Sequence, residues 1–271
     1  MQAIAMNAKE LYDAGKLDEA IAAAGGAVRA KPRDQAARFF LCELLTFAGQ
    51  IERADKQLDA LAQLDPQAML PVALFRQLLR AELARQEFSS AGRVPEFVGE
   101  ISEELKLRLR ASIQLRENDP AAAAESLEAA ERQRRAPQGT CDGQAFNDLR
   151  DMDDLTASVL EVLTSTGKYY WIPLDRLMRV EFKKPQSVRD LIWRQAEVKV
   201  QDGPDGVVYL PALYAGSAQV DNDLLRLGRM TDWRATEPGP VRGIGQRMLL
   251  VGNEDRAFME LGCLEFDAGA S

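Results

Sequence analysis

The strongest constraint on the fold of this chain is a repeat near its N-terminus. Two segments match each other at a spacing of 34 residues, with glycine paired to glycine and proline to proline. A unit of this length buries its apolar face only by stacking on its neighbours, so the spacing predicts a stacked helical array. A generic helical bundle with a coincidental period is the alternative. The matched positions are Ala8 and Cys42, Leu11 and Leu45, Gly15 and Gly49, Leu17 and Ile51, Ala20 and Ala54, Ala24 and Leu58, Ala27 and Leu61, and Pro32 and Pro66.

The residue types at these positions indicate that each unit is a helical hairpin. Gly15 and Gly49 stand where a first helix must end in a tight turn, which glycine allows without steric cost. Small alanines follow where two helices approach closely, and a proline then stops the second helix. We therefore expect helices over residues 16–30 and 52–64, in an array of the tetratricopeptide type.

The repeat pattern weakens further along the chain. Leucines at helical spacing predict a helix over residues 69–86, and a break follows. Another hairpin is expected over residues 100–116 and 120–135, which we interpret as a divergent repeat that caps the array. Residues 1–137 are thus predicted to form a TPR-like α-solenoid.

The composition changes across a turn-rich stretch at residues 136–143, where we place a domain boundary. Trp171, Trp193 and Trp233, the three tryptophans of the chain, all lie beyond it. Aromatic and β-branched residues, which favour strands, replace the alanine-rich helices. Residues 143–271 are therefore predicted to form a second domain.

This second domain is expected to be an antiparallel-strand-rich α+β domain. A helix is predicted over residues 155–164, with Asp153 or Asp154 as its cap, and a helical turn over residues 188–193. Hairpin loops are expected at residues 202–206 and 252–255. The predicted strands cover residues 169–172, 178–182, 197–200, 207–210, 247–251 and 258–266.

Composition excludes several classes of function. The chain contains no histidine, which closes every mechanism that needs an imidazole base, proton shuttle or metal ligand. Its net charge of −8 opposes non-specific binding to nucleic acid and anionic lipid. No apolar run reaches the roughly 18 residues that span a bilayer, and the N-terminus lacks the pattern of a secretory signal. Cys42, Cys141 and Cys263 are widely separated, which predicts reduced structural thiols in a cytoplasmic protein.

Five unusual strings follow one another in the second half of the chain. They are FNDLRDMDD from Phe146, VLEVLTSTGKYYWIP, LPALYAGS, RLGRMTDW and RGIGQRMLLVGNED. Together they resemble the ImpE/TagJ family, accessory proteins of bacterial type VI secretion systems. The resemblance covers the whole chain and is most specific over residues 146–266.

The resemblance implies a non-enzymatic cytoplasmic adaptor with two protein partners. These are a helix of the small subunit of the contractile sheath and the AAA+ unfoldase that recycles the sheath. Tethering would raise the local concentration of sheath near the unfoldase. No catalytic residue, cofactor, metal or small-molecule substrate is implied. A carboxylate- or metal-dependent enzyme and a TPR-type scaffold for another complex stay open as alternatives.

Four aspartates lie close together at Asp148, Asp151, Asp153 and Asp154. Such a cluster can hold Mg²⁺ or Ca²⁺ through oxygen ligands, although the spacing of an EF-hand is absent. It can also contact a partner, for which Asp148 and Asp151 are the candidates. The interpretation that we favour is structural, with a helix cap at Asp153 or Asp154 and ion pairs from the others to Arg150 or other basic groups.

The first helix of each tetratricopeptide unit faces a concave groove. Aromatic side chains in such a groove can accept the apolar face of a partner helix, although packing of the phenylalanines in the core is the alternative. Trp233, in a turn-like string, is expected to be the most exposed tryptophan and a further partner contact. By repeat register, the positions that face the groove are Lys9, Tyr12, Asp13, Phe39, Glu43 and Phe47.

Overall fold

The computed structural model describes residues 6–235 and 237–267. The repeat segment folds as two helical hairpins, as predicted. The four helices are α1 (Ala8–Asp13), α2 (Leu17–Ala30), α3 (Gln35–Phe47) and α4 (Ile51–Leu64).

The turn inside each hairpin has the same geometry 34 residues apart. Gly15 and Gly49 adopt φ of 77° and 68°, the left-handed conformation that favours glycine. The next residue closes each turn, since the Lys16 N–H donates to the Leu11 carbonyl at 3.0 Å and the Gln50 N–H to the Leu45 carbonyl at 2.8 Å. These are the bonds of a Schellman motif, which satisfies carbonyls at a helix end.

A long helix and a second hairpin follow the repeats. α5 (Met69–Ala91) ends at Gly92, which is left-handed at φ 78°. α6 (Glu103–Arg116) and α7 (Pro120–Glu131) pack antiparallel, which confirms the expected hairpin. None of the helices within residues 6–235 and 237–267 is both long and apolar enough to cross a membrane.

The rest of the chain is rich in strands. A nine-stranded sheet has the order β1-β6-β5-β9-β8-β7-β14-β2-β3 and is antiparallel except for the β1–β6 pair. A three-stranded sheet has the order β13-β12-β4, and β10 pairs with β11. The fold class predicted from sequence is therefore confirmed. The strands and the short helix α8 are β1 (Glu96–Phe97), β2 (Gly139–Cys141), β3 (Gln144–Phe146), β4 (Leu149–Asp151), β5 (Val159–Leu163), β6 (Tyr169–Pro173), β7 (Leu177–Phe182), β8 (Trp193–Val200), β9 (Asp205–Pro211), α8 (Asp223–Arg226), β10 (Thr231–Ala235), β11 (Val241–Gly245), β12 (Met248–Val251), β13 (Glu254–Ala257) and β14 (Cys263–Phe266).

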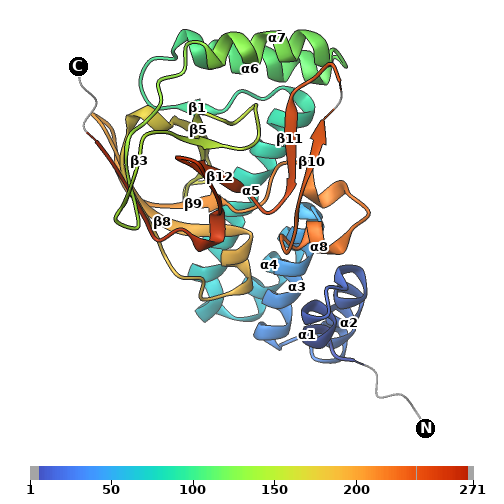
Figure 1. The fold of residues 1–271 in the computed structure, drawn as a ribbon. Helices are drawn as coiled ribbons and strands as arrows, with labels where there is room; N and C mark the ends of the chain where they lie inside the picture. The colour runs from blue at the N-terminus through green and yellow to red at the C-terminus, as the bar shows by residue number, and fades with distance from the viewer. Residues whose placement is uncertain (1–5, 236, 268–271) are drawn as a thin grey trace.

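Helix α5 joins the repeats to the sheets. It lies at the centre of the molecule, with α1 to α4 below it and the α6–α7 hairpin above (Figure 1). Phe75 and Phe88 of α5 pack edge-on against Trp193 and Trp171, at centroid distances of 5.8 and 4.9 Å. One continuous apolar core therefore includes residues from both sides of the boundary expected at residues 136–143.

Three details differ from the sequence predictions. Residues 155–164 form a turn followed by β5 and not a helix. The side chains of β5 are all buried, so a strand covered on both faces replaces the predicted helix. β2 begins inside the stretch expected to be a turn-rich boundary, and residues 258–266 contain a 3₁₀ turn before β14.

Candidate partner-binding site

The repeat hairpins pack against the second half of the same chain. Residues 213–229, which we call the arm, lie against the turns of both repeat hairpins. A Cβ built on Gly15 would meet Leu224 at 2.9 Å, and one on Gly49 would meet Ala218 at 3.0 Å. The arm therefore packs closely on both turns, where the left-handed backbone already favours glycine.

Polar contacts fix the arm to the first hairpin. Asp223 accepts a hydrogen bond from the Leu17 N–H at 2.7 Å, which satisfies a free donor at the start of α2. The Arg226 guanidinium forms two bonds to Asp18 at 3.0 and 3.1 Å. A bidentate arginine–carboxylate pair fixes the relative orientation of the two groups more than a single bond does, so the arm binds the repeats in a defined position.

Two of the predicted groove residues contact the second half of the chain, Tyr12 through the arm and Glu43 through Arg189, which lies outside the arm. Tyr12 is only 5% exposed, with the Arg229 guanidinium 4.8 Å above its ring. Glu43 is half-buried and accepts the Arg189 N–H at 3.1 Å. Burial raises the pKa of Glu43 to about 7, although the Arg189 bond opposes the shift. Both side chains have partners within the chain, and their contact with another protein stays a prediction.

The two predicted groove phenylalanines differ in their surroundings. Phe39 is half-buried and packs against the edge of the core. Phe47 is 2% exposed, packs near Tyr12 and lines a pocket described below. Phe47 is thus a residue expected on the groove that lines this pocket.

The aspartate cluster is a set of ion pairs to arginines, three from other segments and one, Arg150, from within the cluster. Asp153 also accepts the Leu155 N–H, so it caps a turn and not the expected helix. Asp151 is 1% exposed, and burial raises its pKa to about 6 despite its cationic partner. The pairs are Asp148 with Arg134 at 2.6 Å, Asp151 with Arg247 at 2.7 Å, Asp153 with Arg242 at 2.8 Å and Asp154 with Arg150 at 2.8 Å.

These pairs bear on the alternative of a metal site. Each aspartate already has a cation as partner, so a metal ion would have to displace an arginine. Within the described part of the chain, no group of three or more cysteine, aspartate or glutamate side chains is placed to hold a metal ion.

Trp233 is the most exposed tryptophan, as predicted. It lies half-buried on β10 with its ring 5.8 Å from that of Tyr214, while Trp171 and Trp193 are fully buried. The exposed part of its ring can contact another protein, and such a contact stays a prediction.

A buried charge network beneath α5 was not predicted from the sequence. Arg85 donates two bonds to Glu161, at 2.9 and 3.0 Å, and one to Glu82 at 3.4 Å. Arg247 pairs with Glu161 and with Asp151, the latter at 2.7 Å. The network ties α5 to β5 and to the start of β12, so it crosses from the helical half into the strands.

Charges and burial in the network shift the pKa of each carboxyl group differently. Although burial raises it, the pKa of Glu161 is held well below its usual range by Arg85 and Arg247. Burial dominates at Glu82 and raises its pKa, because Arg85 compensates only part of the lost hydration. The two guanidiniums therefore favour the ionised form of Glu161, whereas burial favours the protonated form of Glu82.

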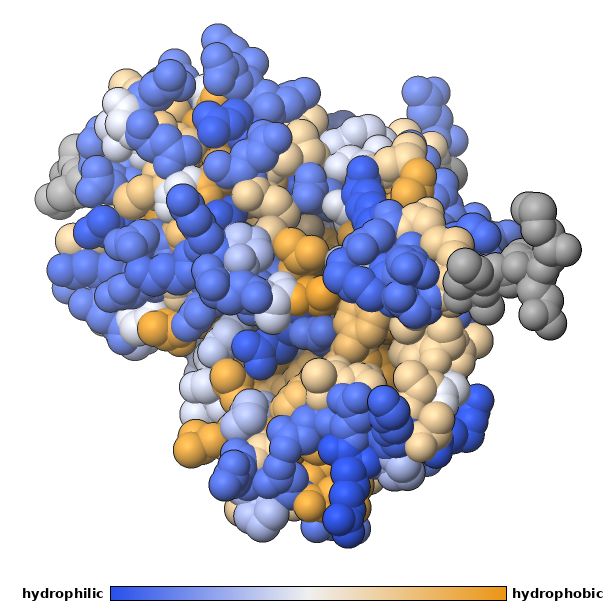
Figure 2. All heavy atoms as spheres, turned by 90° about the horizontal axis from the view of Figure 1, so that it is seen from below, coloured by the Kyte–Doolittle hydropathy of each residue, from blue (hydrophilic) through white to orange (hydrophobic). Residues whose placement is uncertain are grey.

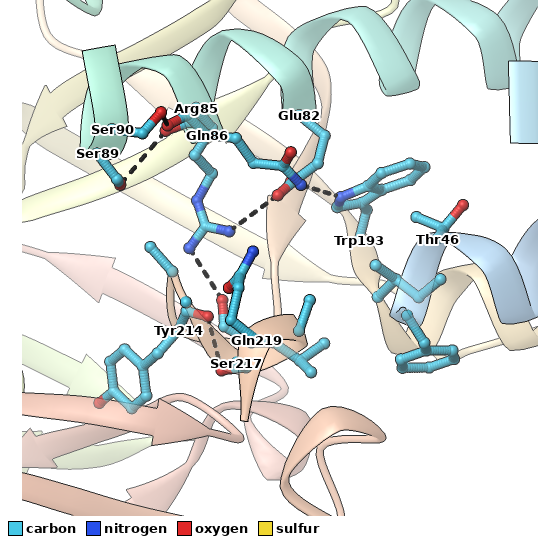
Figure 3. Close-up of a pocket in the computed structure, with 16 residues that line it drawn as sticks. Thr46, Glu82, Arg85, Gln86, Ser89, Ser90, Trp193, Tyr214, Ser217 and Gln219 are labelled. Atoms are coloured by element: carbon cyan, nitrogen blue, oxygen red, sulfur yellow. Dashed lines mark hydrogen bonds and ion pairs between the residues drawn. The ribbon is translucent and has the colours of Figure 1, made fainter. Parts of the chain in front are cut away.

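The network borders a pocket of about 370 Å³ between α3, α5 and the arm, which we call the junction pocket. Figure 3 shows Glu82, Arg85 and Gln86 directed from α5 into this space, with Gln219 rising from the opposite side. Phe47, Ile192 and Leu213 supply apolar wall. Seen from below, apolar side chains gather in the hollow between two lobes that are covered by polar side chains (Figure 2).

A mixed apolar and polar pocket of this size suits a side chain or a short segment of a partner. One sequence signal could have indicated the buried charges beside this pocket. Leu78, Glu82 and Arg85 share one face of a helix at spacings of four and three residues, so two charged residues interrupt an apolar stripe. Charged side chains in such a stripe must find partners when the helix is buried.

Comparison with known proteins gives matches over both halves. A tetratricopeptide repeat model matches residues 11–86, and the model described as ImpE protein matches residues 143–265. The type VI secretion system accessory component TagJ of Pseudomonas aeruginosa is 34% identical over 265 residues, covering 97% of this chain and 92% of that protein. The crystal structure of protein VPA1032 from Vibrio parahaemolyticus has a TM-score of 0.90 at 27% identity, covering 96% of this chain and 97% of the other.

Proposed function

Because the chain belongs to the ImpE/TagJ family, we propose that it is a non-enzymatic adaptor of a type VI secretion system that works in the cytoplasm. The observation that carries the proposal is the similarity to an accessory component along 97% of the chain. A match over this length includes the repeats, the arm and the sheets, so the similarity is not confined to the widespread repeat segment.

We further propose two protein partners, a helix of the small sheath subunit and the AAA+ unfoldase that recycles the sheath. Simultaneous binding would make the encounter of sheath and unfoldase intramolecular, which raises their effective concentration. The junction pocket supports this proposal, because an apolar wall beside polar groups suits the anchor side chains of a helix. Phe47 would contribute to that wall, and Phe39 and Trp233 would contact the partner outside the pocket.

Binding of the purified full chain to the two partners tests this function. We expect the small sheath subunit and the unfoldase each to bind in calorimetric titrations, and the sheath subunit to lose binding when its contacting helix is deleted. Absence of binding by both, with the chain folded by circular dichroism, would overturn the adaptor proposal.

A variant at the pocket mouth tests the site. Gln219 is exposed and lines the pocket, so Gln219→Trp would fill the mouth without entering the core. We expect it to weaken binding of one partner about tenfold or more, because loss of a central anchor costs about 2 kcal/mol or more. Gln67→Trp, on an exposed turn before α5, is the matched control and should bind as the unmodified chain does.

A further inference from the structure

The buried network beneath α5 carries unequal numbers of charges. Glu82, Glu161 and Asp151 supply three carboxylates, while Arg85 and Arg247 supply two guanidiniums. Ionised groups in a buried position are costly unless each is paired, so the excess carboxylate takes up a proton when it is alone and can ionise when a further cation pairs with it.

Glu82 is the carboxylate with the weakest compensation. Glu161 receives both guanidiniums, and Asp151 receives Arg247 at 2.7 Å. Glu82 has only the 3.4 Å contact with Arg85 and a 3.0 Å hydrogen bond from the Trp193 indole N–H. The excess charge is therefore best assigned to Glu82.

The position of Glu82 makes this charge accessible from one side. Among the three carboxylates, Glu82 is the one that lines the junction pocket. The apolar side chains of Phe47, Ile192 and Leu213 line the same pocket, so a group inside it can contact apolar surface as well as the carboxylate. We propose that the junction pocket receives a basic side chain, arginine or lysine, from an apolar segment of a protein partner, and that this side chain pairs with Glu82.

The chemistry of the pocket selects this occupant over other cations. A divalent metal needs several oxygen ligands, and Glu82 is the single acidic side chain in the pocket lining. Arginine and lysine have an apolar stem that packs along apolar walls while the charged end reaches an anion. This inference rests on the proposed adaptor function, and it adds the chemistry by which a partner is recognised.

The pairing is tested on the unmodified protein with short probes. A blocked tripeptide with arginine between two leucines is titrated and compared with the same peptide carrying citrulline, the neutral isostere of arginine. The signal is the Trp193 indole N–H in a nitrogen–proton correlation spectrum, since this group donates to Glu82. We expect a saturable shift with arginine and binding at least about tenfold weaker with citrulline. Equal binding of both peptides, or an unchanged indole signal with arginine, overturns the proposal.

A matched pair of variants separates this inference from the adaptor function. Glu82→Gln keeps an acceptor for Trp193 but removes the excess charge, whereas Glu87→Gln changes an acid on the same helix that pairs with Arg93 outside the pocket. We expect Glu82→Gln to lose about tenfold or more in affinity for the arginine peptide and for one partner, and Glu87→Gln to lose neither. Partners that bind both variants equally would overturn the basic anchor and leave the adaptor intact. Partners that bind neither the variants nor the unmodified chain would overturn the adaptor, and the peptide comparison would still decide on the pocket.

Discussion

Glu161 lies at the centre of the buried network, between the guanidiniums of Arg85 and Arg247. Glu161→Gln would leave two buried cations with one fewer counter-charge, so we expect the free energy of unfolding to fall by about 3–5 kcal/mol. Urea unfolding followed by tryptophan fluorescence measures the change. Glu181→Gln, at an exposed ion pair with Lys183, is the control and should leave the unfolding midpoint in place. A midpoint for Glu161→Gln equal to that of the control would contradict the role assigned to the network.

Glu43 gives the chain a specific dependence on pH. Its pKa is raised to about 7 in the folded protein from an ordinary value of 4.5, chiefly by burial. Because the folded state binds this proton more tightly, the contribution to stability is full below about pH 4.5 and is lost as the pH rises through 7.

The replacement Glu43→Gln removes this titration and retains an acceptor for the Arg189 N–H. We therefore expect its stability relative to the unmodified chain to increase by about 2–3 kcal/mol between pH 4.5 and pH 8. Urea unfolding at both pH values provides the measurement. Glu52→Gln, at an exposed position of α4, should show no such difference, and a flat profile for both variants would refute the prediction.

The turns of the repeat hairpins allow a test at the scale of the element. Gly49 has φ of 68° and its Cβ would lie 3.0 Å from Ala218, so Gly49→Ala should destabilise the chain by about 1–3 kcal/mol. Gly26 lies within α2, where a Cβ has its nearest contact at 4.0 Å, and Gly26→Ala should stabilise by about 0.5–1 kcal/mol. Thermal unfolding of both variants measures whether stability falls for Gly49→Ala and rises for Gly26→Ala. Loss of stability in both would show that α2 needs glycine for a reason other than conformation.

Local signals decided which elements could be predicted. Gly15 and Gly49 fix the hairpin turns through backbone conformation, and this signal does not depend on the rest of the molecule. β5 carries no such signal, because its run of buried residues reads equally well as a helix or as a strand covered on both faces. The Asp142-Gly143 turn between β2 and β3, with φ of 52° and 82°, was present in the sequence as a hairpin signal inside the expected boundary.

The site was harder to predict than the elements, for a reason that belongs to the whole molecule. Repeat register predicted that Phe47 and Tyr12 face a groove, and both side chains are buried within the chain. The cover over the turns of the repeats comes from the arm, and Asp223 contacts Leu17 across 206 residues of sequence. A local pattern contains no information about such a pairing, so the groove was expected to be open. The apolar stripe of α5 is interrupted by Glu82 and Arg85, and this pattern was the one sequence signal that charged residues are paired in the interior.

The two halves of the chain are expected to unfold together. Residues 1–137 and 143–271 are distinct in sequence, yet β1 adds to the edge of the large sheet and Arg85 neutralises Glu161 of β5. Separation of the halves would leave Glu161 without one of its cations, uncover Trp171 and Trp193 and expose the face of α5 that packs on them. The energy of these contacts couples the halves, so partial unfolding should be rare.

Two probes can follow the halves separately in one urea titration. The tryptophans lie beyond residue 143, and most of the helical signal comes from residues before 137. We expect tryptophan fluorescence and far-ultraviolet circular dichroism to give coincident transitions. Arg85→Met should lower both midpoints by the same amount, since an uncompensated Glu161 costs about 3–5 kcal/mol. Arg80→Met, at an exposed position earlier on α5, should leave both midpoints in place. Two separate transitions in the unmodified chain would mean that the sequence boundary is also a folding boundary, and that α5 and the buried network join the halves only weakly.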